Sequence, residues 1–133
     1  MTIEQTPFEV IGEERLHKLV ETFYYHVHRH PLLKPIFPDD LTETIRKQKQ
    51  FLTQYLGGEP LYTEEHGHPR LRARHIPFEI TPERANAWLQ CMKTAMDETQ
   101  LEGDIREFLF NRLILTAKHM VNTNSHELNS LTE

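Results

Sequence analysis

The residues best suited to chemistry lie between His66 and Ile80, where one histidine closes a short basic segment. The segment reads His-Gly-His-Pro-Arg-Leu-Arg-Ala-Arg-His-Ile-Pro-Phe-Glu-Ile, and Pro77 prevents a helix from continuing past His75. Imidazole is the side chain that most often binds metals. The arginines before His75 suit an anionic partner, because a guanidinium offers paired donors to a carboxylate. A haem would satisfy both requirements, and we take haem binding as a hypothesis.

Polar side chains also interrupt the apolar faces of two predicted helices and lie in the middle of a third. Tyr24 follows the buried stripe of its helix, Thr44 and Gln48 share a face one turn apart, and Trp88 is the only tryptophan. Burying a hydroxyl, amide or indole N–H without a partner costs about 1–3 kcal/mol. We therefore expect Tyr24, Gln48 and Trp88 either to bond one another or to face a polar ligand.

Other kinds of site find little support in the chain. His26 and His30 are four residues apart, a spacing that suits zinc or copper, but no cysteine or carboxylate obviously completes a site. We interpret them as solvated. Cys91 lies in an apolar helix and is expected to be a buried, inert thiol. The phosphate-binding glycine motifs and the His-Glu-x-x-His zinc motif are missing from the sequence.

Length and composition indicate one small globular domain. The chain has 133 residues, a formal net charge of -5 and one cysteine. The negative charge argues against nucleic-acid binding, and no apolar run approaches the roughly 20 residues that span a bilayer. The first residues lack the basic start and apolar stretch of a signal peptide. A cytoplasmic protein is therefore expected.

Prolines, glycines and capping residues predict an all-α domain over residues 1–122 and a polar tail over 123–133, frayed from Asn122. The segment from Glu59 to Thr81 is irregular, and loops of this length are uncommon unless they are functional. The final helix is expected to bury Ile105, Phe108, Leu109, Leu113 and Met120. Six helices are predicted. A short one starts at the capping box Thr6-Pro-Phe-Glu9, and three more run from Glu13 to His30, from Asp39 or Asp40 to Gly57, and from Pro69 to His75. The last two start at Thr81-Pro82 and after Gly103.

Taken together, these residues resemble a known family, the group II truncated haemoglobins, in particular the branch found in bacilli. The resemblance covers the chain from about Phe8 to Val121. It rests on Thr22-Phe-Tyr24, His30-Pro-Leu-Leu-Lys-Pro-Ile-Phe37, Gln48-Lys-Gln-Phe51, Tyr55-Leu-Gly-Gly58, His66-Gly-His-Pro69, Leu71-Arg-Ala-Arg-His-Ile-Pro-Phe78 and Trp88.

The resemblance implies a truncated globin fold, a two-over-two helical sandwich around haem b. His75 matches the proximal iron ligand, Tyr24 the distal tyrosine and Trp88 the characteristic tryptophan of the pocket. Thr44 stands where larger globins have a distal histidine, and Gly12-Glu13 reduces the usual first glycine pair. The remaining implied contacts are Gln48 on the ligand side, Phe37 and Phe51 at the porphyrin, and Lys47, Tyr62 and Arg74 near the propionates.

The implied function is reversible binding of dioxygen and other diatomic ligands at a five-coordinate iron. Hydrogen bonds from Tyr24 and Trp88 are expected to slow oxygen release, because donors stabilise a partly charged oxygen. The alternative is a redox enzyme that acts on peroxide or nitric oxide with an external reductase, since the chain has no flavin or nicotinamide domain. Reversible oxygen binding, for storage, transport or sensing, is the favoured role, and a monomer or weak homodimer the expected state.

Overall fold

The structure, a computed structural model, describes residues 5–123 apart from the side chain of Arg72. Every regular element among these residues is helical, as the sequence predicts. The elements are α1 (Pro7–Ile11), α2 (Glu13–Val27), the 3-10 turn η1 (Lys34–Ile36), α3 (Thr42–Tyr55), α4 (Leu61–His66), α5 (Leu71–His75), α6 (Pro82–Glu98) and α7 (Asp104–Met120).

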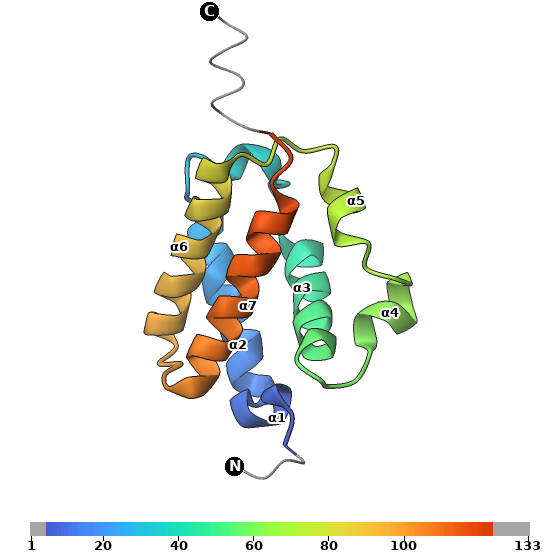
Figure 1. Cartoon of the computed structure of the whole chain (residues 1–133), viewed down its shortest axis with the longest axis vertical. Coiled ribbons are helices and arrows are strands. Elements are labelled where there is room, and N and C mark those ends of the chain that lie inside the picture. Colours follow the sequence, from blue (N-terminus) through green and yellow to red (C-terminus); the bar gives the residue numbers. More distant parts are fainter. Residues whose placement is uncertain (1–4, 124–133) are drawn as a thin grey trace, which may run out of the picture.

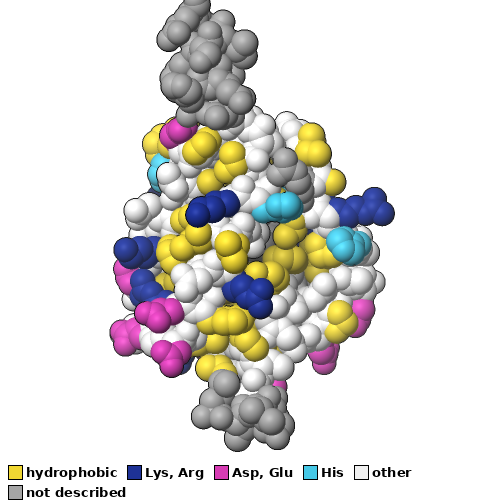
Figure 2. All heavy atoms as spheres, in the orientation of Figure 1, with side chains coloured by type: hydrophobic (Ala, Val, Ile, Leu, Met, Phe, Trp, Pro, Cys, Tyr) yellow, Lys and Arg dark blue, Asp and Glu magenta, His cyan; other side chains and the backbone are white. Residues whose placement is uncertain are grey.

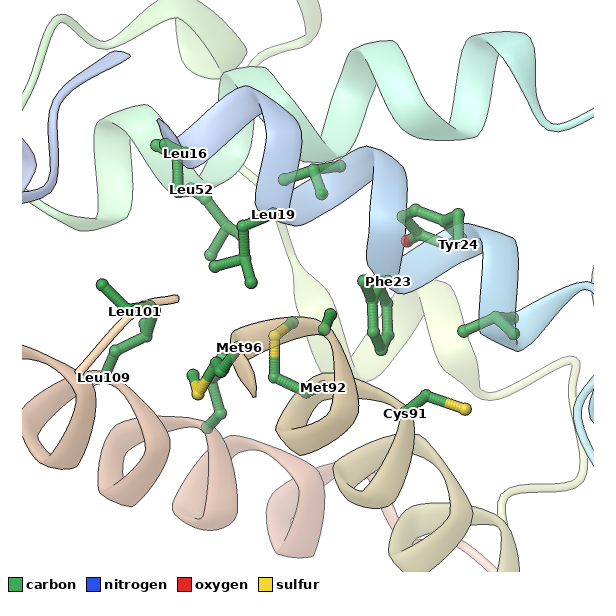
Figure 3. Packing of buried hydrophobic residues seen from close by; sticks show 14 of the residues in the cluster. Leu16, Leu19, Phe23, Tyr24, Leu52, Cys91, Met92, Met96, Leu101 and Leu109 are labelled. Carbon is green, nitrogen blue, oxygen red and sulfur yellow. The ribbon is translucent and has the colours of Figure 1, made fainter. Parts of the chain in front are cut away.

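Four long helices form two layers, α2 with α3 and α6 with α7 (Figure 1). Figure 3 shows the seam between the layers, where Leu19 and Phe23 of α2 face Met92 and Met96 of α6. These four side chains are fully buried. The short helices α4 and α5 lie outside the two layers (Figure 1), where α4 contacts α3 and α5 contacts α7. Isolated helices this short are not stable in water, so α4 and α5 depend on contacts with other elements.

The predicted helix starts are largely confirmed by their caps. The Thr6 hydroxyl accepts from the Glu9 backbone N–H at 3.1 Å, and the Glu9 carboxylate accepts from the Thr6 N–H at 3.2 Å. Thr81 caps α6 by accepting from the Arg84 N–H at 3.1 Å. Of the two candidates before α3, Asp40 accepts from the first helical N–H, that of Thr42, at 3.0 Å.

Several predicted boundaries are wrong. α2 ends at Val27 instead of His30, because the N–H of His30 bonds to the Val27 carbonyl in a tighter turn. α5 begins at Leu71, not Pro69. The segment expected to be irregular after Glu59 contains α4. Phe108, expected in the core, is 39% exposed on the outer face of α7.

The predicted fraying from Asn122 is also wrong for the first two residues of the tail. The backbone N–H groups of Asn122 and Thr123 both donate to the Ile80 carbonyl, at 3.0 and 3.2 Å. Residues 124–133 of the predicted tail lie outside the described residues. Within residues 5–123, no helix combines the length and apolarity needed to cross a membrane.

Two leucines on α7 test whether the seam between the layers carries the stability of the fold. Leu109 is 0% exposed and Leu115 is 66% exposed. We expect Leu109→Ala to lower the free energy of unfolding by about 2–5 kcal/mol, because it leaves a cavity in the core. Leu115→Ala should change it by less than about 0.5 kcal/mol. Urea unfolding of the two variants measures both values, and equal losses would contradict the assignment.

Candidate functional site

A cavity of about 430 Å³ lies between the layers and the short helices. Cavities of this size are typical of small-molecule and cofactor sites. On the face shown in Figure 2, apolar side chains gather at the centre, with basic and histidine side chains around them. The structure brings together every residue that the sequence singled out for cofactor or ligand binding. They are Tyr24, Phe37, Thr44, Lys47, Gln48, Phe51, Tyr62, Arg74, His75 and Trp88.

His75 is the last residue of α5, and its ring is oriented by the backbone of the same helix. Its Nδ1 lies 2.6 Å from the Leu71 carbonyl oxygen. A carbonyl only accepts, so Nδ1 carries the proton and donates. With Nδ1 as the donor, Nε2 is the nitrogen of this ring that can bind a metal. His75 lines the cavity, which makes this nitrogen the best metal ligand in its wall.

Tyr24 and Trp88 are positioned by a fully buried aromatic ring between them. Phe23 is 0% exposed and meets Tyr24 edge-on, with ring centroids 4.8 Å apart. It meets Trp88 edge-on as well, at 5.2 Å. Burial raises the pKa of the Tyr24 phenol well above its ordinary value, and Arg74 offsets only part of this shift. The phenol is therefore a protonated donor at neutral pH.

The polar side chains of the cavity wall do not bond one another. Tyr24, Thr44, Gln48 and Trp88 make no side-chain hydrogen bond to any other residue in the described part of the chain. Of the two expectations for these groups, mutual bonding is therefore wrong. These groups therefore stay open to water or a ligand, and among the described residues no fully buried side-chain nitrogen or oxygen lacks a partner.

Basic side chains line one part of the cavity. Arg74 lies over the Tyr62 ring, with its guanidinium carbon 5.0 Å from the ring centroid. Partial burial lowers the pKa of Arg74, but a guanidinium stays charged at neutral pH. Lys47 has no ion-pair or hydrogen-bond partner among the described residues. Two cations thus face the cavity without a carboxylate to neutralise them.

Arg84 also lines the cavity, yet its guanidinium already has partners. Its Nε donates to the Leu32 carbonyl at 2.9 Å, and Nη1 donates to the Glu79 carbonyl at 2.7 Å. These bonds tie the chain before η1 to the chain before α6. The guanidinium of Arg84 is therefore held by backbone carbonyls, and Lys47 and Arg74 are the cations available to an anion.

Tyr62 reaches the cavity because α4 is held against α3 by polar side chains. Gln54 and Thr63 exchange hydrogen bonds of 2.7 and 2.9 Å. Arg46 donates to both oxygens of Glu65, at 2.9 and 2.6 Å. Hydrogen bonds from Arg46, and then from Gln50, lower the pKa of Glu65 from 4.5 to about 2. This strip fixes α4, a six-residue helix that lacks an apolar face of its own.

The sequence analysis missed most of the apolar wall. Leu113 and Met120 were expected to be core residues because they lie on the buried stripe of α7, but both also line the cavity. Ala85 and Ala117 line it too and were not singled out. Small side chains at these places leave room between helices. Helical periodicity alone does not distinguish a stripe that faces a cavity from one that faces packed side chains.

Two other predicted features lie outside the cavity. His26 is paired with Glu98 through Nε2. Residues 5–123 contain no group of three or more histidine, cysteine, aspartate or glutamate side chains placed to hold a metal ion. Cys91 is 5% exposed, and burial raises the pKa of its thiol, which confirms the expectation of a buried, unreactive group.

Comparison with known proteins decides the family. The model of the family described as bacterial-like globin matches residues 6–122. The chain belongs to the bacterial-like globins. Within these globins it is 74% identical over 121 residues to the group 2 truncated hemoglobin YjbI of Bacillus subtilis, an alignment covering 91% of this chain and 92% of that protein.

Solved structures confirm the truncated globin fold. The group II truncated hemoglobin of Bacillus anthracis matches with a TM-score of 0.90 and 70% identity, over 91% of this chain and 99% of that one. The group II 2-on-2 hemoglobin of Agrobacterium tumefaciens matches with a TM-score of 0.85 and 37% identity, over 94% and 100%. The chain is a group II truncated haemoglobin, and membership of this globin family implies a haem and diatomic gas ligands.

The lowered pKa of Glu65 predicts how acid weakens the polar contacts between α3 and α4. A carboxyl whose pKa is lowered in the folded state stabilises the fold above its unfolded value, and this contribution disappears as pH falls from 4.5 toward about 2. We expect Glu65→Gln to lower the Tm at neutral pH, and the difference from wild type to shrink over that interval. Thermal unfolding across the pH range measures this difference.

The matched control is Glu64→Gln, which changes an exposed carboxylate on the same helix that has no partner among the described residues. It should leave the Tm close to that of wild type throughout. A Glu65→Gln deficit of constant size down to the lowest pH would contradict the assigned role of the ion pair.

Proposed function

We propose that the cavity binds haem b with His75 as its iron ligand, and that the protein binds dioxygen reversibly and releases it slowly. The observation that carries this proposal is the hydrogen bond from His75 Nδ1 to the Leu71 carbonyl. It leaves Nε2 as a lone-pair donor in the wall of a cavity where Tyr24, Thr44, Gln48 and Trp88 make no side-chain hydrogen bond to another described residue.

The residues present fit a haem. Its porphyrin is large and apolar, and apolar side chains dominate the wall, including Phe37 and Phe51. Its propionates are anionic, and Lys47 and Arg74 line the cavity without a carboxylate partner. Bound haem would supply an iron that can bind a diatomic ligand.

The protein's contribution on the ligand side is a set of fixed donors. The Tyr24 hydroxyl remains protonated because burial raises its pKa, and the Trp88 indole N–H can only donate. A donor hydrogen bond to a partly charged oxygen contributes about 1.5–3 kcal/mol, or roughly one to two decades of affinity. The surrounding apolar wall limits access of water that would compete for these donors.

A relative supports slow release. The truncated haemoglobin of Bacillus subtilis that matches this chain with a TM-score of 0.88 and 75% identity, over 89% of this chain and 100% of that one, is described as oxygen-avid. We propose the same property for this protein. Its physical basis would be Tyr24 and Trp88, with Thr44 and Gln48 as further polar groups on the ligand side.

The first test is an absorption spectrum of the haem-reconstituted protein, ferric, reduced, and reduced under dioxygen or carbon monoxide. We expect an intense Soret band and stable complexes with both gases. His75→Ala should weaken or shift the band, because the iron loses its protein ligand. His28→Ala, outside the cavity, should resemble wild type. A wild-type protein without a Soret band would overturn the proposal.

The second test concerns the donors. Replacing Tyr24 and Trp88 together with phenylalanine should speed dioxygen dissociation by roughly 10- to 100-fold, because their donated hydrogen bonds are lost. Stopped-flow dissociation kinetics measure the rate. Tyr25→Phe is the matched control, since the Tyr25 side chain is 54% exposed and lies outside the cavity. An off-rate unchanged in the double variant contradicts the role of these donors.

A further inference from the structure

We infer that Asn122 is a positioning residue for His75, which fixes the loop after His75 to the end of α7 through its side-chain amide. The inference rests on the proposed function in one respect, because it takes His75 to be the iron ligand. It concerns a residue outside the cavity wall, one that does not touch the cofactor site.

The amide of Asn122 binds the loop between α5 and α6 at both ends. Its Nδ2 donates to the His75 carbonyl at 3.1 Å and to the Phe78 carbonyl at 2.9 Å. Its Oδ1 accepts from the Ile80 N–H at 2.9 Å and from the neighbouring Thr123 hydroxyl at 2.9 Å. Two carbonyl acceptors face one end of the amide and a backbone donor faces the other, so the partners themselves fix which atom is nitrogen and which is oxygen.

The backbone of Asn122 adds a further bond to the same loop. Its N–H donates to the Ile80 carbonyl at 3.0 Å. Ile80 therefore accepts from the backbone of Asn122 and donates to its side chain. We name this set of bonds the Asn122 clasp, comprising the contacts of Asn122 with His75, Phe78 and Ile80.

The simpler explanation of an asparagine at this place is that it ends α7. Asparagine is favoured just after a helix because it tolerates a positive φ. Among the described residues, however, the only non-glycine residues with positive φ are Arg70 and Gln100. Asn122 therefore does not have a positive φ, and the feature that distinguishes it at this position is the set of hydrogen bonds made by its side-chain amide.

Apolar packing does not fix this loop. Ile76 is 65% exposed and Phe78 is 45% exposed, and only Ile80, at 8%, is buried. Pro77 has no N–H to donate. α5 itself is five residues long, too short to be stable alone. α5 contacts α7, and Arg84 holds the loop further on at the Glu79 carbonyl. The bond from Asn122 is the side-chain restraint that acts at the carbonyl of His75 itself.

The consequence concerns the ring that would bind iron. The His75 carbonyl is held by the clasp, and the His75 ring is held by the Leu71 carbonyl. The two restraints act on the same residue from the two sides of its Cα. Loss of the clasp leaves the ring attached to a five-residue helix that can rotate, which changes the angle at which Nε2 meets the iron.

The test uses the full chain with Asn122→Ala, Asn122→Asp and Asn122→Gln. Alanine removes all side-chain bonds of the clasp. Aspartate keeps the acceptor for the Ile80 N–H but loses both donations, whereas glutamine keeps the amide on a longer stem. Asn111→Ala is the matched control, because Asn111 is an exposed residue of α7 without a hydrogen-bond partner among the described residues.

Two readouts separate the clasp from its effect on His75. In the haem-free chain, amide exchange of the Ile80 N–H should be about tenfold faster in Asn122→Ala and close to wild type in Asn122→Asp. In the reduced, haem-loaded protein, resonance Raman spectroscopy reports the iron–histidine stretch. We expect this band to shift and broaden in Asn122→Ala and Asn122→Asp, to recover partly in Asn122→Gln, and to stay unchanged in Asn111→Ala.

The outcomes distinguish the two proposals. A wild-type chain that binds no haem overturns the proposed function, whatever the exchange data show. Haem bound through His75 with an unchanged iron–histidine band in both Asn122→Ala and Asn122→Asp overturns the positioning role alone. Unchanged exchange of the Ile80 N–H in Asn122→Ala overturns the clasp itself.

Discussion

A chain of 133 residues surrounds a cavity of about 430 Å³. Because no side-chain packing crosses that space, the cavity walls must be held in place by contacts that lie outside it. Small domains bury a limited fraction of their surface, so contacts outside the cavity carry much of the stability. The structure divides the work between two kinds of restraint. The first is the apolar packing between the layers, which includes Leu16, Leu19 and Met96 (Figure 3). The second is a set of polar side chains that bind the short elements.

The polar restraints share one design, in which a side chain on a long helix, or just after one, binds the backbone or side chain of a shorter segment. Arg46 holds α4 through Glu65, Arg84 holds the chain at Leu32, and Asn122 holds the loop after His75. Such bonds contribute less than the burial of a large apolar side chain when they lie near solvent. The short-helix side is therefore the more easily adjusted part of the molecule, and it carries His75.

The sequence predicted the individual chemical groups better than the elements that carry them. His75, Tyr24 and Trp88 stand out because each is a polar group in an apolar or punctuated setting, and that setting is local in sequence. α4 was missed because its six residues have no apolar period and are held by α3, through pairs such as Gln54 with Thr63. The Asn122 clasp joins residues 42 to 47 positions apart, a relation that no local pattern contains.

The difference between local and long-range relations also explains why the sequence left two expectations open for the polar residues of the cavity wall, namely bonding to one another or facing a ligand. Whether Tyr24 and Trp88 bond each other depends on the position of Phe23, whose ring meets both of their rings in T-shaped contacts. That position follows from the packing of α2 on α6. The wall around Tyr24 and Trp88 is thus set by close packing, which resists change, and the wall around His75 by hydrogen bonds, which can be altered one at a time. Substitutions on the two sides should therefore affect different properties, donor geometry in the first case and the orientation of His75 in the second.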